Sequence, residues 1–556
     1  MPELHKDYMK ETFAEDGTMT AVSFAIPEDF NFAYDVVDRI AHEEPGRRAM
    51  QWCDIQGDER LFSFGDIRRD SDRAASYFQS LGIGRGDRVM LILKRHHEFW
   101  PCAMALHKLG AVCIPATHML QVKDLVYRFQ AASVKAVVCT AVGEISQHVE
   151  EACRACPSVS LRVLVRGART GWHSYEEGTA ASAPFVRPTG SAAPVVTDTM
   201  LLYFTSGTTG MPKMVIHDYS YPLAHIVTAK HWHNVDPDGL HFTVAETGWA
   251  KSAWGKLYGQ WLMAAGIFVF DFDRFVPAEL LSRIEKYRIT TFCAPPTIYR
   301  FLIKEDLTRF DLSSLQYVTI AGEALNPEVY EQFRTATGLK LMEGFGQTET
   351  TVQIANFPWM EPKPGSMGRP NPMYDILLAD EEGNDVRAGQ VGEICIRTGE
   401  GRPVGMFGGY LQNDELTDRV WHDGVYHTGD MAWRDEDGYF WYIGRDDDII
   451  KSSGYRIGPF EVESVLMEHP AVLECAVVGV PDPVRTQVVK ATVVAAKGYV
   501  PSDALAQELQ EYVKTHTAPY KYPRILEFVN ELPKTISGKI RRTEIRQQDR
   551  RREETK

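Results

Sequence analysis

Strand-like and helix-like stretches alternate along most of this 556-residue chain. Residues 64–81 have the apolar spacing of a helix, and residues 88–93 form an apolar run typical of a buried strand. A second helix-like stretch, residues 99–109, ends at Gly110. The pattern continues through four strand candidates, at residues 267–270, 290–294, 317–321 and 341–343. Such alternation predicts an α/β fold of βαβ units, in which helices cover a largely parallel sheet.

The sequence pattern changes at two places along the chain. Residues 365–442 contain short strands interrupted by Gly, Asp and Asn, which indicates a small β-barrel or a distorted sheet. A charged run at residues 445–448 then precedes a compact segment with both helical and strand patterns. We therefore predict a large N-terminal domain of βαβ subdomains with a small β-barrel, residues 1–445, and a small α+β C-terminal domain, residues 446–556.

Composition narrows the class of protein. The chain is 44% hydrophobic and 24% charged, as ordinary globular proteins are. It has no apolar run of about 18 residues, so no transmembrane helix is predicted. The charged first 16 residues lack the apolar core of a secretory signal, and the nine cysteines are scattered. We therefore expect a reducing, cytoplasmic location.

Charge and cysteine spacing disfavour two classes of partner. The formal net charge is −15, and residues 446–556 hold 17 basic and 17 acidic side chains, so the negative excess lies before residue 446. That balance argues against nucleic acid as a partner. Cys153 and Cys156 form a lone Cys-x-x-Cys pair with no second pair at zinc spacing, which disfavours a metal or redox site there. The sequence leaves the oligomeric state open.

A hydroxyl- and glycine-rich loop lies between two apolar runs, residues 201–204 and 214–216. Glycines let backbone N–H groups approach an anion closely, the hydroxyls add donors, and a lysine adds a mobile positive charge. The loop therefore predicts a polyphosphate site, although a shorter match would read as a surface turn. It lacks the Gly-Lys-Ser/Thr ending of a P-loop. Its residues are Thr205, Ser206, Gly207, Thr208, Thr209, Gly210, Met211, Pro212 and Lys213.

Four later motifs make this loop more specific. Residues 344–349, Gly-Phe-Gly-Gln-Thr-Glu, follow a strand and end in a carboxylate that suits an oxygen-ligand cation such as Mg²⁺. Residues 426–430 place Asp430 after a glycine, where it can accept hydrogen bonds from a ribose diol. Residues 444–457 supply an arginine, an acidic run and a glycine, and residues 533–540 present a lysine on a Ser-Gly turn. Each motif alone could be an ordinary turn, a capping residue or a surface charge. All five motifs in this order are very unlikely to occur by chance.

Together the five motifs resemble the adenylate-forming superfamily of acyl-CoA synthetases, adenylation domains and luciferases, over residues 32–542. Residues 246–254, 292–300, 481–485 and 520–524 resemble the AMP-forming medium-chain acyl-CoA synthetases more closely. One departure is Phe345, where the family usually has Tyr, so the ring is kept and a phenol oxygen is lost.

The resemblance implies a ligase with two half-reactions in one site. A carboxylate attacks the α-phosphate of ATP to give acyl-AMP and diphosphate, and the CoA thiolate then displaces AMP. It implies that the Thr205–Lys213 loop holds the leaving phosphates, that Glu349 binds Mg²⁺, and that Thr348 faces the α-phosphate. Asp430 would bind the ribose hydroxyls, with Arg445 beside it. The adenine site would be lined by Gly322, Glu323, Ala324, Glu343, Gly344, Phe345, Gly346 and Gln347.

The resemblance also implies a mobile C-terminal domain. Lys539 would bridge the attacking carboxylate and the α-phosphate, because a compact ammonium can serve both oxygens. The domain would then turn about a hinge at Asp447, withdraw Lys539 and bring a loop for the CoA arm to the site. The residues implied for CoA are Ser453, Gly454, Tyr455, Arg456, Arg485, Tyr522 and Arg524.

The sequence gives little information about the residues that line the acyl pocket. Trp249 matches the family position beside the acyl group, although it reads equally well as a core aromatic. An amino acid substrate is disfavoured, because residues 246–249 read Glu-Thr-Gly-Trp where amino-acid-activating relatives have Phe-Asp-x-Ser. Alternatives remain: an enzyme that loads a carrier protein, an aryl or short-chain CoA ligase, or a non-enzymatic nucleotide-binding module. The last would be expected to lose Lys539 or Glu349.

Overall fold

The structure is a computed structural model that describes residues 3–205, 211–323, 325–399, 401–453, 455–535 and 539–554. Its first large sheet has seven strands and is mainly parallel, with β10 and β11 as an antiparallel pair at one edge. In spatial order the strands are β11 (Lys213–Asp218), β10 (Thr199–Thr205), β6 (Val112–Pro115), β5 (Arg88–Ile92), β7 (Ala136–Thr140), β8 (Leu161–Val165) and β9 (His173–Ser174).

Helices of the first sheet's βαβ units begin and end where the sequence indicates. Helix α2 (Phe64–Ser80) starts in a capping box, in which Ser63 and Asp66 satisfy each other's backbone N–H groups. Helix α3 (Phe99–Leu109) ends at Gly110, whose φ of 71° is easily adopted only by glycine. Every residue of α3 is buried, so this helix lies inside the domain. Helices α4 (Val122–Ala131) and α5 (Ile145–Arg154) pack together.

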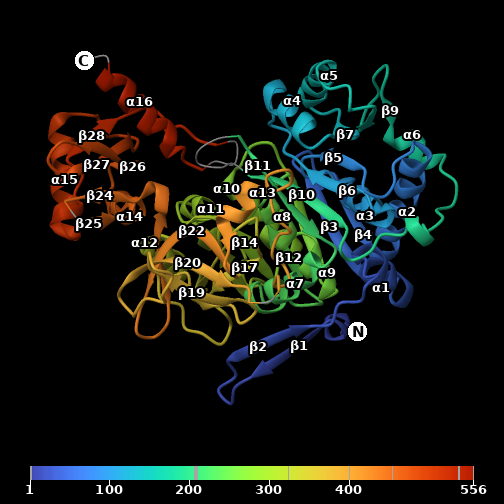
Figure 1. Cartoon of the computed structure of the whole chain (residues 1–556), viewed down its shortest axis with the longest axis horizontal. Coiled ribbons are helices and arrows are strands. Elements are labelled where there is room, and N and C mark those ends of the chain that lie inside the picture. The colour runs from blue at the N-terminus through green and yellow to red at the C-terminus, as the bar shows by residue number, and fades with distance from the viewer. Residues whose placement is uncertain are drawn as a thin grey trace.

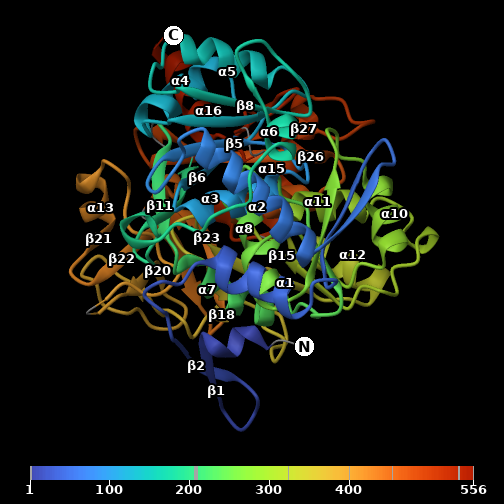
Figure 2. The same cartoon turned by 90° about the vertical axis from the view of Figure 1, so that its right-hand side faces the viewer.

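The second large sheet has nine strands with a parallel centre. In spatial order they are β18 (Arg369–Pro370), β17 (Val352–Ala355), β16 (Leu341–Gly346), β15 (Tyr317–Ile320), β14 (Thr291–Ala294), β12 (Leu240–Thr243), β13 (Gly266–Asp271), β3 (Arg48–Asp54) and β4 (Glu59–Ser63). Its helices are α7 (Tyr221–Val227), α8 (Ala250–Gly255), α9 (Tyr258–Leu262), α10 (Pro277–Tyr287), α11 (Pro296–Leu302) and α12 (Pro327–Thr337). Figure 2 shows α10, α11 and α12 at one side of the molecule and α13 (Asp414–Val420) at the other.

Residues 375–445 form a five-stranded antiparallel sheet. Its order is β19 (Asp375–Ala379), β20 (Val391–Arg397), β22 (Val425–Arg434) and β21 (Trp421–His422), with β23 (Phe440–Arg445) also paired to β22. Register shifts interrupt the ladder in β20 and β22. Of the two structures predicted for this region, a small β-barrel and a distorted sheet, the protein has the distorted sheet. An additional hairpin, β1 (Met9–Phe13) with β2 (Met19–Phe24), was not predicted.

The C-terminal segment builds a separate sheet around its own apolar core. Its strands are β25 (Tyr455–Ile457), β24 (Ile450–Ser452), β27 (Thr486–Ala495) and β26 (Val472–Asp482), with β28 (Ile525–Phe528) also paired to β27. Its helices are α14 (Pro459–Glu468), α15 (Asp503–His516) and α16 (Arg542–Glu554). Figure 1 shows this part, in orange and red, to one side of the rest. We place the domain boundary between β23 and β24.

Within the described ranges, no helix combines the length and the apolar character that crossing a bilayer requires.

Candidate active site

The predicted phosphate loop joins two paired strands. Thr205 at the end of β10 lies opposite Lys213 at the start of β11, which fixes the two ends of the loop side by side. Ser206, Gly207, Thr208, Thr209 and Gly210 lie outside the described residues. The Lys213 ammonium is 5.1 Å from the centre of the Tyr410 ring. Burial lowers the pKa of Lys213, while the nearby Glu349 carboxylate opposes that shift.

Glu349 and Thr348 lie in the turn after β16, and their positions are fixed by hydrogen bonds. The Tyr410 hydroxyl donates to Glu349 Oε1 at 2.8 Å, and the Phe407 N–H donates to the Glu349 carbonyl at 2.7 Å. Nε2 of the buried His217 donates to the Thr348 carbonyl at 2.8 Å. Burial lowers the pKa of His217 to about 4, so the ring is neutral at pH 7 and holds this carbonyl without a positive charge.

Asp430 is buried in β22 at the centre of a polar network. Gln347 Nε2 donates to Asp430 Oδ2 at 2.5 Å, and the Tyr442 hydroxyl donates to Oδ1 at 3.0 Å. Arg445 donates to the Thr428 carbonyl at 3.0 Å and lies 3.3 Å from Asp430 Oδ2. Burial raises the pKa of Asp430, and the Arg445 charge limits the rise. This network joins three of the predicted nucleotide-binding residues.

The predicted adenine strip lies at the ends of β15 and β16. Gly322 has a φ of 108°, and Lys251 from α8 donates to the carbonyl of the preceding Ala321. Glu323 is exposed and accepts from the Thr297 hydroxyl at 3.0 Å. Ala324 lies outside the described residues. Glu343 is buried, and burial raises its pKa to about 8, so its side chain is mainly a neutral carboxylic acid at pH 7.

Two glycines of the 344–349 motif are required by packing as well as by the loop. A Cβ at Gly344 would lie 2.5 Å from the Trp232 ring, and one at Gly346 would lie 2.5 Å from the Trp254 ring. Between them, the Phe345 ring lies 6.0 Å from the Tyr442 ring. The strand therefore rests directly on two buried indoles, and Trp254 is a core aromatic.

Trp249 lies half-buried at the start of α8. The turn before it is anchored by Glu246, which accepts from the Thr117 hydroxyl at 2.7 Å and lies 3.3 Å from His118. A Cβ at Gly248 would lie 2.4 Å from the backbone of residues 116 and 117. These contacts hold the Trp249 turn against the loop after β6, next to the Lys251 contact with the adenine strip.

Lys539, the predicted catalytic lysine, lies in the C-terminal domain. Its backbone N–H donates to the Thr535 hydroxyl at 3.1 Å, which closes the turn that carries it, and its residue is exposed. Burial raises the pKa of Asp430 and lowers the pKa of Lys251, and the Lys539 charge is a minor influence on either group.

The described residues predicted to bind CoA lie in the β24–β25 hairpin, in the turn between β26 and β27, and just before β28. Ser453 and Arg485 hold each other, through a backbone hydrogen bond of 3.0 Å and a side-chain contact of 3.3 Å. Tyr455 stacks on Tyr520 with ring centres 4.0 Å apart. Arg456 pairs with Glu381 at 2.6 Å across the boundary, and Arg524 donates to the Tyr522 hydroxyl at 2.8 Å. Gly454 lies outside the described residues.

The acidic run at the predicted hinge differs from the solvated segment expected from sequence. Residues 446–448 form one turn of 3-10 helix, in which Asp446 and Asp447 are exposed. Asp448 is instead buried and pairs with Arg546 of α16 at 2.6 Å. The third aspartate therefore belongs to the C-terminal domain's own packing, because a buried carboxylate needs a partner. Asp447 lies 3.9 Å from Arg445.

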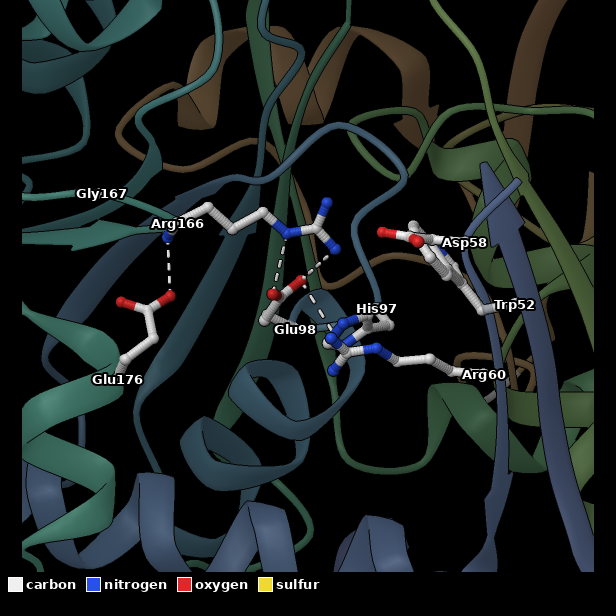
Figure 3. A pocket seen from close by; sticks show the side chains of 8 residues that line it. All are labelled: Trp52, Asp58, Arg60, His97, Glu98, Arg166, Gly167 and Glu176. Carbon is white, nitrogen blue, oxygen red and sulfur yellow. Dashed lines mark hydrogen bonds and ion pairs between the residues drawn. The ribbon is translucent and has the colours of Figure 1, made fainter. Parts of the chain in front are cut away.

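A separate cavity of about 540 Å³ lies away from these residues. Figure 3 shows Arg166 reaching across it to Glu98, which it pairs with at 2.9 Å, while Trp52 and Arg60 come from the opposite side. None of the predicted site residues lines this cavity.

Sequence reasoning missed several residues that position the site. Tyr410, Tyr442, His217 and Lys251 carry no motif of their own, and their partners are distant in the chain. Lys251 alone had a local signal, since it lies in the 246–254 stretch that resembles the medium-chain synthetases.

Comparison with known proteins now identifies the family. The "AMP-binding enzyme" family matches residues 37–411, and its "AMP-binding enzyme C-terminal domain" matches residues 461–539. The chain belongs to the AMP-binding enzymes. It is 43% identical over 536 residues to rat "Acyl-coenzyme A synthetase ACSM4, mitochondrial", covering 94% of this chain and 91% of that one. It is 40% identical over 564 residues to mouse "Acyl-coenzyme A synthetase ACSM3, mitochondrial", covering 99% and 96%.

Solved structures agree with this relationship. The anthranilate CoA ligase AuaEII in complex with anthranoyl-AMP matches with a TM-score of 0.86 and 28% identity, covering 94% of this chain and 98% of that one. A benzoate CoA ligase from Burkholderia xenovorans LB400 matches with a TM-score of 0.80 and 28% identity, covering 93% and 100%. These findings confirm the predicted fold and the prediction of an acyl-CoA synthetase, an acid–thiol ligase that uses a carboxylic acid, ATP and CoA.

One prediction is wrong on this comparison. A cytoplasmic location was expected from the charged N-terminus and the scattered cysteines, but the curated relatives carry the word mitochondrial in their names.

Proposed function

We propose that this AMP-binding enzyme activates a medium-chain or similarly small carboxylic acid in the site around Asp430. In the first half-reaction, the substrate carboxylate attacks the α-phosphate of ATP and diphosphate leaves. In the second, the CoA thiolate attacks the acyl carbonyl and AMP leaves. The observation that carries this proposal is the polar network in which Gln347, Tyr442 and Arg445 converge on the buried Asp430 carboxylate.

Each half of the site has an assigned task. Asp430 accepts the ribose hydroxyls, and Arg445 and Gln347 hold its carboxylate in place. Residues 205–213 hold the β- and γ-phosphates, and Thr348 faces the α-phosphate. Lys539 stabilises the charge that moves from carboxylate to phosphate, which is electrostatic catalysis by a preorganised group.

The residues around Glu349 fit a magnesium ion. A hard cation of this kind takes carboxylate and phosphate oxygens. Tyr410 engages Oε1 of Glu349 and fixes the side chain beside Lys213. A carboxylate can accept several partners, so Glu349 can still offer a ligand oxygen. Bound Mg²⁺ would supply charge neutralisation on the phosphates.

The acyl group is assigned to the Trp249 side of the site. The names of the relatives give no acid, while two structural neighbours are ligases of aromatic acids. The half-buried Trp249 ring offers an apolar surface to the acyl chain.

Diphosphate release should be measured with acetate, butyrate, octanoate, benzoate and a branched acid, with and without CoA. The proposal predicts acid-dependent diphosphate release without CoA, and free acyl-CoA and AMP once CoA is added, with the highest kcat/KM for butyrate or octanoate. Higher kcat/KM for benzoate would replace the medium-chain assignment. Acyl transfer only to a carrier protein would contradict the use of CoA.

A further inference from the structure

A glutamate, a cysteine and a histidine meet on the outer face of the sheet of residues 375–445. Glu393 and Cys395 are two residues apart in β20 and so share one face of the strand. Cys395 lies directly opposite His427 of β22 in the antiparallel register. A register shift between Glu393 and Cys395 lets Glu393 reach the same point. Within the part of the chain that the structure describes, this is the group whose side chains could share a metal ion.

The distances between the three side chains match those of a zinc site. Cys395 Sγ is 3.5 Å from His427 Nδ1, which is 2.9 Å from Glu393 Oε2, and all three ligand atoms lie within 4.8 Å of one another. Tetrahedral zinc, with Zn–S near 2.3 Å and Zn–N near 2.0 Å, places sulfur and nitrogen about 3.5 Å apart. The carboxylate would need to move by only a few tenths of an ångström.

Burial and charge also suit this ion. Cys395 is fully buried beside Leu377 and Ala379, while the Glu393 and His427 side chains are 25% and 27% exposed, so an ion can enter from their side. A thiolate, a carboxylate and a neutral imidazole give two negative charges, which a divalent cation cancels. Soft sulfur with nitrogen and oxygen ligands favours Zn²⁺ over Mg²⁺ or Ca²⁺.

We propose that Glu393, Cys395 and His427 bind Zn²⁺, with water as the fourth ligand. The Sγ–Zn bond forms as the thiol proton leaves to solvent, and His427 binds through Nδ1. The backbone N–H of Gly429 donates to Glu393 Oε1 at 2.8 Å, one residue before Asp430. The bound ion therefore braces the strand that carries Asp430, from the face opposite the buried Tyr426.

The test uses the full-length protein, stripped of metal with a chelator and then titrated. Zn²⁺ affinity is measured by competition with a chromogenic chelator, and Co²⁺ is added as a spectroscopic probe. The wild type should bind one Zn²⁺ with an affinity at least about tenfold above that of Cys395→Ser or His427→Gln. It should show a thiolate-to-cobalt charge-transfer band that Cys395→Ser lacks. Zn²⁺ should also raise the melting temperature of the wild type more than that of either variant.

Cys153→Ser is the matched control, because Cys153 is also a free cysteine but lies outside the trio. It should keep the wild-type affinity and the cobalt band. If Cys395→Ser does not fold, His427→Gln carries the test, since that side chain is partly exposed. Equal Zn²⁺ affinity in the wild type and the folded trio variants, or no cobalt–thiolate band in the wild type, would overturn the proposal. The trio would then be an ion pair over a buried thiol.

Discussion

The nucleotide side and the CoA side of this enzyme are built in opposite ways. Around Asp430, the polar side chains interlock: Gln347, Tyr442 and Arg445 all contact one buried carboxylate. On the C-terminal domain, the assigned CoA residues are mostly exposed, and Tyr455 stacks only on another exposed ring, that of Tyr520. Burial preorganises the charged groups around Asp430, while the exposed residues assigned to CoA suit the proposed movement of the C-terminal domain.

The boundary between the two regions fits this difference. Asn326 donates to the Ser464 carbonyl at 3.2 Å, and Arg300 contacts the Met467 sulfur. Arg456 pairs with Glu381, whose side chain is 79% exposed. Exposed pairs of this kind contribute at most about 1 kcal/mol each. These three contacts are polar, and the apolar packing across the boundary includes a small cluster of Met431, Ile443 and Ile449 beside the predicted hinge.

The largest effect is expected from Lys539→Ala. This variant lacks the positive charge that, in the proposed mechanism, the C-terminal domain brings to the nucleotide site. Diphosphate release should fall by about 10³-fold, in line with losing one preorganised charge at the reacting centre. CoA attack on supplied acyl-AMP should stay within a few-fold of wild type. Lys534→Ala, which removes an exposed lysine paired with Glu474, is the control. Wild-type diphosphate release by Lys539→Ala would break the comparison.

Glu343→Gln tests whether burial keeps the Glu343 side chain protonated at neutral pH. The folded-state pKa of Glu343 is raised from 4.5 to about 8, so the unfolded chain ionises first as pH rises. The free energy of unfolding of the wild type therefore falls as the pH rises from 4.5 to 8, and at pH 7 it is lower by about 3 kcal/mol. The glutamine variant has no such titration, so its free energy of unfolding lacks this decrease.

Unfolding of both proteins by urea should be followed at pH 5 and pH 7.5. The stability difference should favour Glu343→Gln more strongly at the higher pH. Glu323→Gln is the control, because it removes an exposed carboxylate nearby and should leave the pH dependence of stability unchanged. Parallel pH profiles for wild type and Glu343→Gln would contradict the neutral buried acid.

Asp430→Asn keeps the shape of the network and removes its charge. The KM for ATP should rise by about 10–100-fold, because a hydrogen bond to a charged group is worth about 1.5–3 kcal/mol. Initial rates across ATP concentrations give this value, and exposed Asp437→Asn is the control. An unchanged KM for ATP would remove Asp430 from the ribose site.

The smallest effect concerns substrate choice. Trp249→Ala should enlarge the acyl pocket and shift kcat/KM by about tenfold toward longer or bulkier acids, the low end of the effect of one methylene in an apolar pocket. The panel of acids used for the wild type measures this ratio. A uniform loss across all acids, with a lower melting temperature, would show that Trp249 is a core residue.

Much of the N-terminal fold follows from local sequence. The apolar run at 88–93 became β5, and the helix ended by Gly110 became α3, because burial of a short run decides each element. The motif residues Gln347, Asp430 and Arg445 converge because the parallel and antiparallel sheets meet at β16 and β22.

Other features depend on contacts that no local pattern encodes. Asp448 reads as part of a solvated run until Arg546, 98 residues later, pairs with it. The trio of Glu393, Cys395 and His427 depends on the register of two strands that are separated by a long connection. The hairpin at residues 9–24 also lies outside what helix–strand alternation predicts.

The central claim is that one rigid site serves two reactions because the C-terminal domain turns about Asp447. Both half-reactions should be measured in single turnovers of Asp447→Pro and Asp447→Ala. Proline fixes φ and restricts the preceding residue, so it should trap one orientation of the C-terminal domain, which we take to be the adenylating one. We expect Asp447→Pro to keep diphosphate release while acyl-CoA formation collapses at saturating CoA, and Asp447→Ala to be much milder. Equal loss of both half-reactions in Asp447→Pro, or unchanged acyl-CoA formation, would contradict the claim.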